Sequence, residues 1–249
     1  MNSVITVAVH ECRLLFKSPL AWIALAVVEF LLAVLFLILL NQFLNPSPWL
    51  AGHGVTEIVI AGLLQVTGII LLLVTPFITM RIFSEERRTG TINLLYSSPV
   101  SLTQLVLGKY LGVMIFMLLM LLLIALMPLS LMMGTDIDLL QFSAGLLGLL
   151  LLMGGFVAIG LFVSTLTSQP SVAAIITFGI LFMLWIINLA SGTGSDWFRE
   201  VFTYISLLNH YNNLINGLFN TVDVIYYLII ITGFVALSIW RLDSERFFQ

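Results

Sequence analysis

The stretch FITMRIFSEERRTGTINLLYSSPVSLTQLVLGKY, residues 77–110, carries an unusual concentration of charge. The 249-residue chain has only 9 Lys or Arg and 12 Asp or Glu residues, and six of them fall in this one interval between two apolar runs. These six are Arg81, Glu85, Glu86, Arg87, Arg88 and Lys109. We therefore predict that the interval is a compact, charged projection from a protein built for an apolar environment.

The composition of the chain predicts a membrane protein. Hydrophobic residues make up 61% of the sequence and charged residues 8%, whereas soluble domains carry roughly a quarter charged residues. The net charge of −3 comes with no cluster of basic residues on one face, which excludes a nucleic-acid partner. Because Cys12 is the only cysteine, the chain can form neither an intramolecular disulfide nor a multi-cysteine metal site.

Six uncharged or nearly uncharged apolar runs are long enough to be membrane-spanning helices. A helix rises about 1.5 Å per residue and the hydrocarbon core is about 30 Å thick, so a span needs about 20 residues. The runs are apolar on every face, which excludes the alternating strands of a barrel. We predict an all-α integral membrane protein with spans at Leu20–Leu40, Ile58–Met80, Tyr110–Met133, Leu139–Leu166, Ser171–Ser191 and Val224–Trp240.

The basic residues between the spans predict the orientation, because Lys and Arg are retained on the cytoplasmic side. The connections on one side of a six-span protein hold all but one of them, and only Arg199 lies on the other side. We therefore expect both termini and the 77–110 stretch to face the cytoplasm, in a multi-pass protein of the cytoplasmic (inner) membrane. The basic residues on that side are Arg13, Lys17, Arg81, Arg87, Arg88, Lys109, Arg241 and Arg246.

Two segments outside the spans have amphipathic patterns. Residues 1–19 alternate apolar and polar groups at helical spacing, which predicts an interfacial helix in contact with membrane lipid before Pro19 turns the chain inward. Residues 192–223 are too polar to span, yet they hold aromatic and aliphatic side chains, Trp197 and Phe202 among them, at helical spacing. We predict short helices there, at the outer face.

The charged stretch itself contains signals for two helices. Ser84 precedes Glu85 and Glu86, which predicts a helix capped by Ser84 with its acidic residues at the positive end of the dipole. Gly90 weakens this helix and Pro99 is expected to end it. A capping box over residues 101–104 then predicts a new helix that continues into the third span.

Motifs for catalysis are missing from the sequence. The only Gly-Lys pair, Gly108-Lys109, is followed by Tyr110 and has Thr103 in place of the first glycine of a phosphate-binding loop. His10-Glu11 lacks the second histidine of a zinc-protease motif. We therefore predict no catalytic, cofactor or metal residues in this chain.

Isolated residues within the spans raise further hypotheses. An ionised Glu29 would be costly near the middle of the first span, so it either faces a cavity or makes a hydrogen bond at a subunit contact. Pro76 can kink the second span next to the charged stretch and act as a hinge. The pairs Gly108-x-x-x-Gly112 and Gly154-x-x-x-Ala158 permit close helix contacts and are weak indications of dimer faces.

The charged stretch resembles the cytoplasmic loop of ABC-2 type transporter permeases, in particular the gliding-motility and copper-enzyme-maturation branch. The segment 210–227 is similar to the same branch through His210, Gly217, Asp223 and Tyr226. One departure is Asn93, where an acidic residue is expected after Gly-Thr-Ile. The positions that match in the loop are Pro76, Met80, Arg81, Glu85, Glu86, Gly90, Thr91, Leu94, Leu95, Pro99, Gly108 and Lys109.

The resemblance implies a division of labour between subunits. Two six-span subunits, identical or homologous, would pair, and the loop between spans two and three of each would be a coupling helix seated on a separate ABC ATPase. ATP and Mg²⁺ would then be bound by the partner and not by this chain. The loop residues implied in that contact are Arg81, Glu85, Glu86, Arg87, Arg88, Gly90, Thr91, Leu94, Leu95 and Pro99.

Three functions stay open at this point. The first is the membrane-spanning subunit of an ATP-driven exporter. The second is a coupler that transmits ATPase motion to a periplasmic or external machine without moving a solute, with Trp197, Phe202, His210 and Asp223 in its outer partner site. The third is an ion-driven transporter or channel, which the near absence of ionisable groups other than Glu29 within the spans disfavours.

Overall fold

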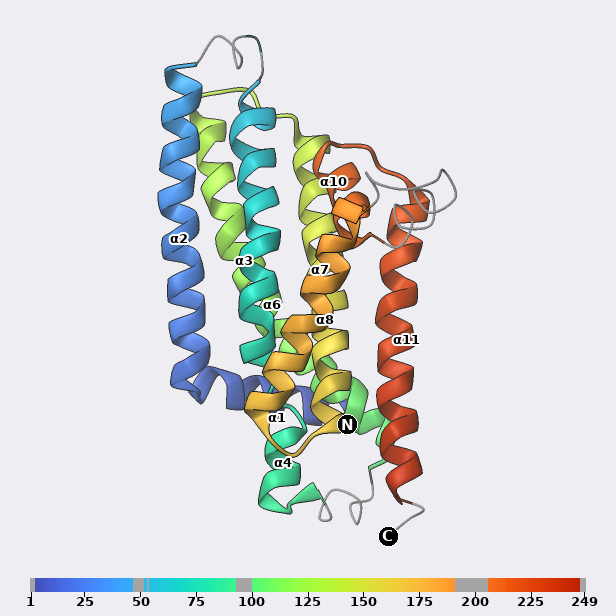
Figure 1. Cartoon of the computed structure of the whole chain (residues 1–249). Coiled ribbons are helices and arrows are strands. Elements are labelled where there is room, and N and C mark those ends of the chain that lie inside the picture. Colours follow the sequence, from blue (N-terminus) through green and yellow to red (C-terminus); the bar gives the residue numbers. More distant parts are fainter. Residues whose placement is uncertain (1–2, 47–51, 53, 93–99, 191–205, 247–249) are drawn as a thin grey trace.

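The structure, a computed structural model, describes residues 3–46, 52, 54–92, 100–190 and 206–246. Its described elements are all helical (Figure 1). They are α1 (Ser3–Lys17), α2 (Pro19–Leu44), the π-helical turn η1 (Thr56–Ala61), α3 (Gly62–Thr79), α4 (Ser84–Thr89), α6 (Leu102–Ser130), the 3-10 turn η2 (Leu131–Met133), α7 (Leu139–Leu166), α8 (Pro170–Ala190), α10 (Leu207–Ile215) and α11 (Thr221–Arg246).

Six helices of the described chain are long and apolar enough to cross a membrane, which confirms the six predicted spans. They are α2, α3 with its η1 extension, α6, α7, α8 and α11. Helix α6 begins eight residues earlier than the predicted span, at Leu102, because the predicted capping box is present. Ser101 Oγ accepts from the Gln104 backbone N–H, and the Gln104 side chain accepts from the Ser101 backbone N–H.

Helix α7 lies at the centre of the bundle. Within the most apolar part of each helix, 72% of the α7 residues are buried, against 17% for α2 and for α8. Helices α3, α6, α8, α10 and α11 all pack against α7. Glycines allow these close contacts; Thr79 of α3, for example, fits against Gly160, where a Cβ would lie 2.2 Å from the Thr79 hydroxyl.

Helix α1 lies across one end of the bundle, roughly perpendicular to α2 (Figure 1). It packs on α6 over Gly108 and Gly112, where a Cβ would come within 2.6 Å of Val7 and 2.7 Å of Glu11. This glycine pair therefore seats a helix of the same chain, and the interpretation as a dimer face is wrong. Gly154 likewise faces Ile231 of α11 within the chain.

The loop that carries α4 differs from the prediction at both ends of the helix. Ser84 is the first helical residue and not the cap, and its hydroxyl donates to the Met80 carbonyl. The helix ends at Thr89 because Gly90 adopts a left-handed conformation (φ 73°), in which its N–H reaches back to the Arg87 carbonyl. Residues 93–99, which include Pro99, lie outside the described chain.

Helix α10 covers part of the segment predicted as outer-face helices. It is packed into the bundle at the end opposite α4 (Figure 1), and it contacts α7, α8 and α3. Tyr211 is fully buried and donates a hydrogen bond of 2.6 Å to the Leu64 carbonyl of α3. Tyr227 of α11 donates to the Leu207 carbonyl at 2.9 Å. Helix α10 is thus held by buried hydrogen bonds as well as by apolar contacts.

Candidate functional site

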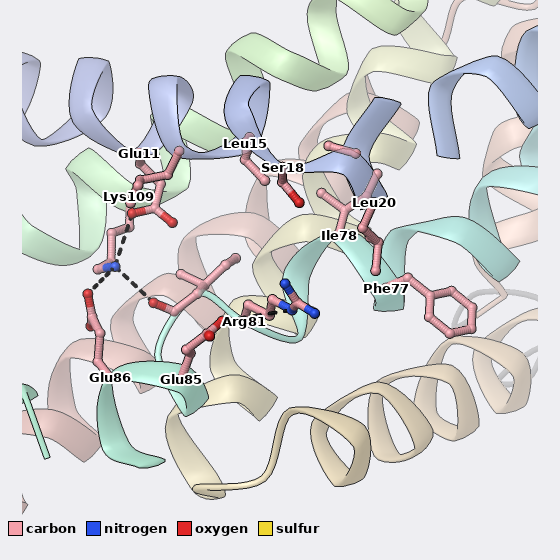
Figure 2. A pocket seen from close by; sticks show the side chains of 13 residues that line it. Glu11, Leu15, Ser18, Leu20, Phe77, Ile78, Arg81, Glu85, Glu86 and Lys109 are labelled. Carbon is pink, nitrogen blue, oxygen red and sulfur yellow. Dashed lines mark hydrogen bonds and ion pairs between the residues drawn. The ribbon is translucent and has the colours of Figure 1, made fainter. Parts of the chain in front are cut away.

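The end of the bundle that carries α4 has a buried ammonium at its centre. Lys109 is 4% exposed, and its Nζ lies 3.0 Å from a Glu11 carboxylate oxygen, 2.8 Å from a Glu86 carboxylate oxygen and 2.8 Å from the Ile82 carbonyl. Figure 2 shows the three acceptors around the nitrogen. The Phe83 ring centroid is 5.0 Å away, within range of a cation–π contact. All three donors of the ammonium therefore have a partner.

This cluster joins three helices. Glu11 comes from α1, Glu86 from α4 and Lys109 from α6. Because two carboxylates share one cation, each depends on Lys109 to offset the loss of its hydration on burial. The cluster therefore fixes α4 to α1 and α6 through one side chain, Lys109.

A second ion-pair group fixes α4 to the last span. Arg87 forms a bidentate pair with Glu245 of α11, in which Nη1 lies 3.1 Å from Oε1 and Nη2 contacts Oε2. Arg241, one turn earlier on α11, lies 2.8 Å from the same carboxylate. The Arg87 and Glu245 side chains are only 16% and 21% exposed, so the pair is screened less than a surface pair.

The other charges of the stretch point outward. Arg81, Glu85 and Arg88 have side chains that are 52%, 41% and 60% exposed. Glu85 lies 3.8 Å from Arg81 and 3.6 Å from Arg88, and exposed pairs of this kind contribute little to stability. The charged residues predicted for partner contact thus divide: Glu86 and Arg87 hold α4 in place, while Arg81, Glu85 and Arg88 are accessible.

The remaining predicted loop residues are only partly described. Gly90 ends α4, and the exposed Thr91 has its hydroxyl 3.0 Å from that of Thr89. Leu94, Leu95 and Pro99 lie outside the described residues, as does Asn93.

Pro76 lies inside α3, one turn before the helix ends at Thr79. Its carbonyl accepts the Met80 N–H at 2.9 Å, which closes the last turn of the helix. The N–H that proline lacks would have donated one turn earlier, to the Leu72 carbonyl. The side chain is buried and lines an apolar cleft between α3 and α8. Pro76 lies eight residues before α4. Its role as a hinge stays a prediction.

Glu29 is half-buried on α2. One of its carboxylate oxygens is enclosed and has no hydrogen-bond partner among the described residues. Its predicted role at a cavity or a subunit contact stays a prediction.

The opposite end of the bundle holds a buried polar pair. His210 Nδ1 of α10 lies 2.5 Å from Asp223 of α11, and Asn213 donates to the same carboxylate at 3.3 Å. Tyr226 stacks on His210 with ring centroids 4.1 Å apart. The structure thus brings together three residues of the C-terminal motif at the contact between α10 and α11. Trp197 and Phe202 lie outside the described residues.

The sequence did not predict two residues of this site, Glu11, which pairs with Lys109, and Glu245, which pairs with Arg87. Both lie far from their partners in the chain, 98 and 158 residues away. A partial signal existed for Glu11, because the glycines on both sides of Lys109 indicate a helix seated at that level. For Glu245, the sequence offers a carboxylate on a late helix with nothing to indicate its partner.

The six apolar helices define a multi-pass helical membrane protein, and within its described part no group of three His, Cys, Asp or Glu residues could hold a metal. Comparison with known protein families matches residues 45–241 to the family described as ABC-2 family transporter protein. The chain belongs to this family and is a permease subunit of an ABC transporter. Members are generally membrane subunits without catalytic activity, which work with an ABC ATPase. No curated protein matches the chain closely enough to show a relative.

Proposed function

We propose that this chain is the membrane-spanning subunit of an exporter in the cytoplasmic membrane, driven by ATP that a separate ATPase subunit hydrolyses. Helix α4 is the coupling helix, and the end of the bundle that carries α4 and α1 faces the cytoplasm. A second permease subunit, identical or homologous, completes the transporter. ATP and Mg²⁺ are bound by the ATPase. The resemblance of the α4 loop to the gliding-motility and copper-enzyme-maturation branch supports this assignment.

The observation that carries the proposal is the division of charge on α4 and the turn before it. A docking element must be rigid where it joins its own subunit and accessible where it meets its partner. Glu86 and Arg87 supply the first property through buried or half-buried ion pairs. Arg81, Glu85 and Arg88 supply the second with exposed side chains of both signs. The presence of both acidic and basic side chains favours a specific protein partner, because basic residues alone are enough to orient a membrane protein.

The same contacts give a route for motion. A force on α4 would reach α1 and α6 through Lys109, α11 through Arg87, and α3 through the short connection after Met80. Closure of two ATPase subunits would then move these helices as a rigid body and open the bundle toward the other side. Pro76 is the proposed hinge within α3.

Charge reversal on the exposed face tests this function. We expect the Glu85→Lys, Arg88→Glu double variant to reduce both the amount of ATPase that co-purifies and the permease-stimulated ATP hydrolysis by about tenfold. The reversed charges would repel the partner charges that the wild-type residues attract. The matched control is the Asp243→Lys, Arg13→Glu double variant, which reverses exposed charges at the same end of the bundle. Unchanged co-purification and hydrolysis in the α4 variant would contradict the proposal.

The coupler without solute transport is the second hypothesis from the sequence. It depended on an outer partner site with Trp197 and Phe202, which lie outside the described residues. The two other residues of that site, His210 and Asp223, are buried between α10 and α11. The described residues therefore favour the exporter.

A further inference from the structure

An apolar cleft lies between α3 and α8 on the side of the bundle. Its volume is about 680 Å³, within the range of ligand pockets. Leu73, Pro76 and Phe77 of α3 and Ala174, Ile175 and Phe178 of α8 line it, and Ser171 is its only polar lining residue in the described chain. Phe77 and Ile175 are 54% and 71% exposed, so the cleft is open along its side at the level of the membrane-spanning helices.

The cleft continues into a charged pocket at the α4 end of the bundle. Met80 and Ser171 line both the apolar cleft and a neighbouring pocket of about 260 Å³, whose charged lining residues are Arg81, Glu85 and Arg88. From Met80 to Leu73 the groove follows about 10 Å of α3, given the helical rise per residue. The two pockets together form one amphipathic cleft, with an apolar part among the spans and a charged part where the spans end.

The charged part has an excess of positive charge. Two guanidinium groups share the single carboxylate of Glu85 at 3.8 and 3.6 Å, which is longer than a hydrogen bond. Within the described residues, neither the Arg81 nor the Arg88 guanidinium group donates a hydrogen bond. Their N–H groups are therefore available to a phosphate, which guanidinium groups bind well. Figure 2, which looks into a neighbouring pocket, shows the Arg81 and Glu85 side chains close together, with Phe77 further along α3.

We propose that this cleft binds an anionic phospholipid of the surrounding leaflet. One acyl chain lies between α3 and α8, and the phosphate accepts from the N–H groups of Arg81 and Arg88 that do not face Glu85. Lipid is the occupant that this geometry favours, because the cleft opens sideways into the membrane and its polar end lies where lipid headgroups lie. The net positive charge selects an anionic headgroup over a zwitterionic one.

The site does not rest on coupling to an ATPase, because it is formed by the permease alone. The site would affect the transporter through its position next to α4. The bound phosphate would contact Arg81, in the turn before α4, and Arg88 on α4, so the lipid would lie directly beside the proposed docking face.

The test uses purified full-length permease without ATPase, in nanodiscs of equal phosphatidylglycerol and phosphatidylcholine. After transfer to detergent, retained lipid is counted by native mass spectrometry. We expect the wild-type chain to retain phosphatidylglycerol in preference to phosphatidylcholine. The Arg81→Gln, Arg88→Gln variant should lose that preference by about tenfold or more, the effect of losing charge-assisted hydrogen bonds. The control is Arg13→Gln, which removes an exposed charge at the same end.

Blocking the apolar part is the second arm. Ala174→Phe places a ring in the cleft and should abolish lipid retention, whereas Ala236→Phe, on an exposed position of α11, should leave it unchanged. Because Ala174 is only 7% exposed, Ala174→Phe could also disturb core packing. Ile175→Trp, at the open rim of the cleft, is therefore a second blocking variant whose side chain lies outside the core.

Three results would overturn the inference. The first is wild-type permease that retains both lipids equally or retains none. The second is an unchanged preference in the double arginine variant, and the third is full retention in Ile175→Trp. None of these involves the ATPase, so failure here is distinct from failure of the co-purification test.

Discussion

At the residue scale, Lys109 decides how the α4 end is held together. A buried carboxylate, Glu11, and a partly buried one, Glu86, surround one ammonium, and the second oxygen of Glu86 has no hydrogen-bond partner among the described residues. Such a cluster is not a general source of stability, because all three groups lose hydration on burial. Its role is specificity, since α1, α4 and α6 fit together in one arrangement that satisfies the cation.

Removing the ammonium should be costly. We expect Lys109→Met to destabilise the protein by about 3–5 kcal/mol, because the buried Glu11 and the partly buried Glu86 lose their counter-ion. Thermal unfolding of the purified permease in detergent measures the effect. Lys17→Met, an exposed lysine on α1, is the matched control and should leave the midpoint nearly unchanged. Adding Glu11→Gln and Glu86→Gln to Lys109→Met should recover part of the loss. A midpoint for Lys109→Met equal to that of the control would contradict this account.

The sequence predicted the charged stretch but not the direction of each side chain. Glu85 and Arg88 are three residues apart on α4, and Arg81 lies in the turn before it; the structure shows all three exposed. Glu86 and Arg87 lie on the other side of α4. Their partners could not be predicted, because the contacts with Glu11, Lys109 and Glu245 depend on how distant helices pack.

At the element scale, two small helices are positioned by the spans. Helix α1 fits into a notch that Gly108 and Gly112 open on α6, and α4 is held between Lys109 and Glu245. Both helices contribute to one end of the bundle, the end at which the proposed partner docks (Figure 1).

Filling the glycine notch should displace α1. We expect Gly112→Leu to lower stability by about 1–3 kcal/mol or more, because even a Cβ would lie 2.7 Å from Glu11 and 2.8 Å from the Ala8 carbonyl. Gly179→Leu on α8, where nothing lies within 4 Å of an added Cβ, is the control and should be tolerated. Unfolding midpoints in detergent compare the two variants. Equal effects would show that α1 is not seated as described.

Releasing α4 from α11 should loosen it locally. We expect Arg87→Gln to increase amide hydrogen exchange across Ser84–Ile92, because the bidentate pair with Glu245 is lost. Arg88→Gln, at the next residue, removes an exposed guanidinium and should leave exchange unchanged. Exchange followed by mass spectrometry gives the comparison. If both variants exchanged alike, the pair would not be what holds α4.

The spans were predictable from the sequence and the short elements only in part. Long uniformly apolar runs can hardly be anything other than membrane helices, so six spans followed directly. Helix ends depend on local signals: the capping box at Ser101 predicts the start of α6 correctly, whereas α4 ends at Gly90, well before the predicted end at Pro99. The burial of α10 could not be predicted, because it depends on Tyr211 reaching a carbonyl of α3, 147 residues away in the chain.

At the scale of the whole molecule, the chain is a bundle around α7 with different elements at its two ends. One end holds α10 through the buried His210–Asp223 pair and Tyr211. The other end holds α1 and α4 through ion pairs and leaves one charged face accessible. Such an arrangement suits a permease subunit that is moved from outside, because force applied at one place is spread over several spans.

The most direct test of the central claim is photo-cross-linking in membranes that contain the complete transporter. A benzoylphenylalanine replaces Arg88 on the exposed face of α4, and in a second variant it replaces Asp136 in the exposed connection at the opposite end. Our account predicts an ATPase cross-link from position 88, changing in yield during ATP turnover, and none from position 136. An ATPase that is captured from position 136, or is not captured from position 88 in any nucleotide state, would contradict it.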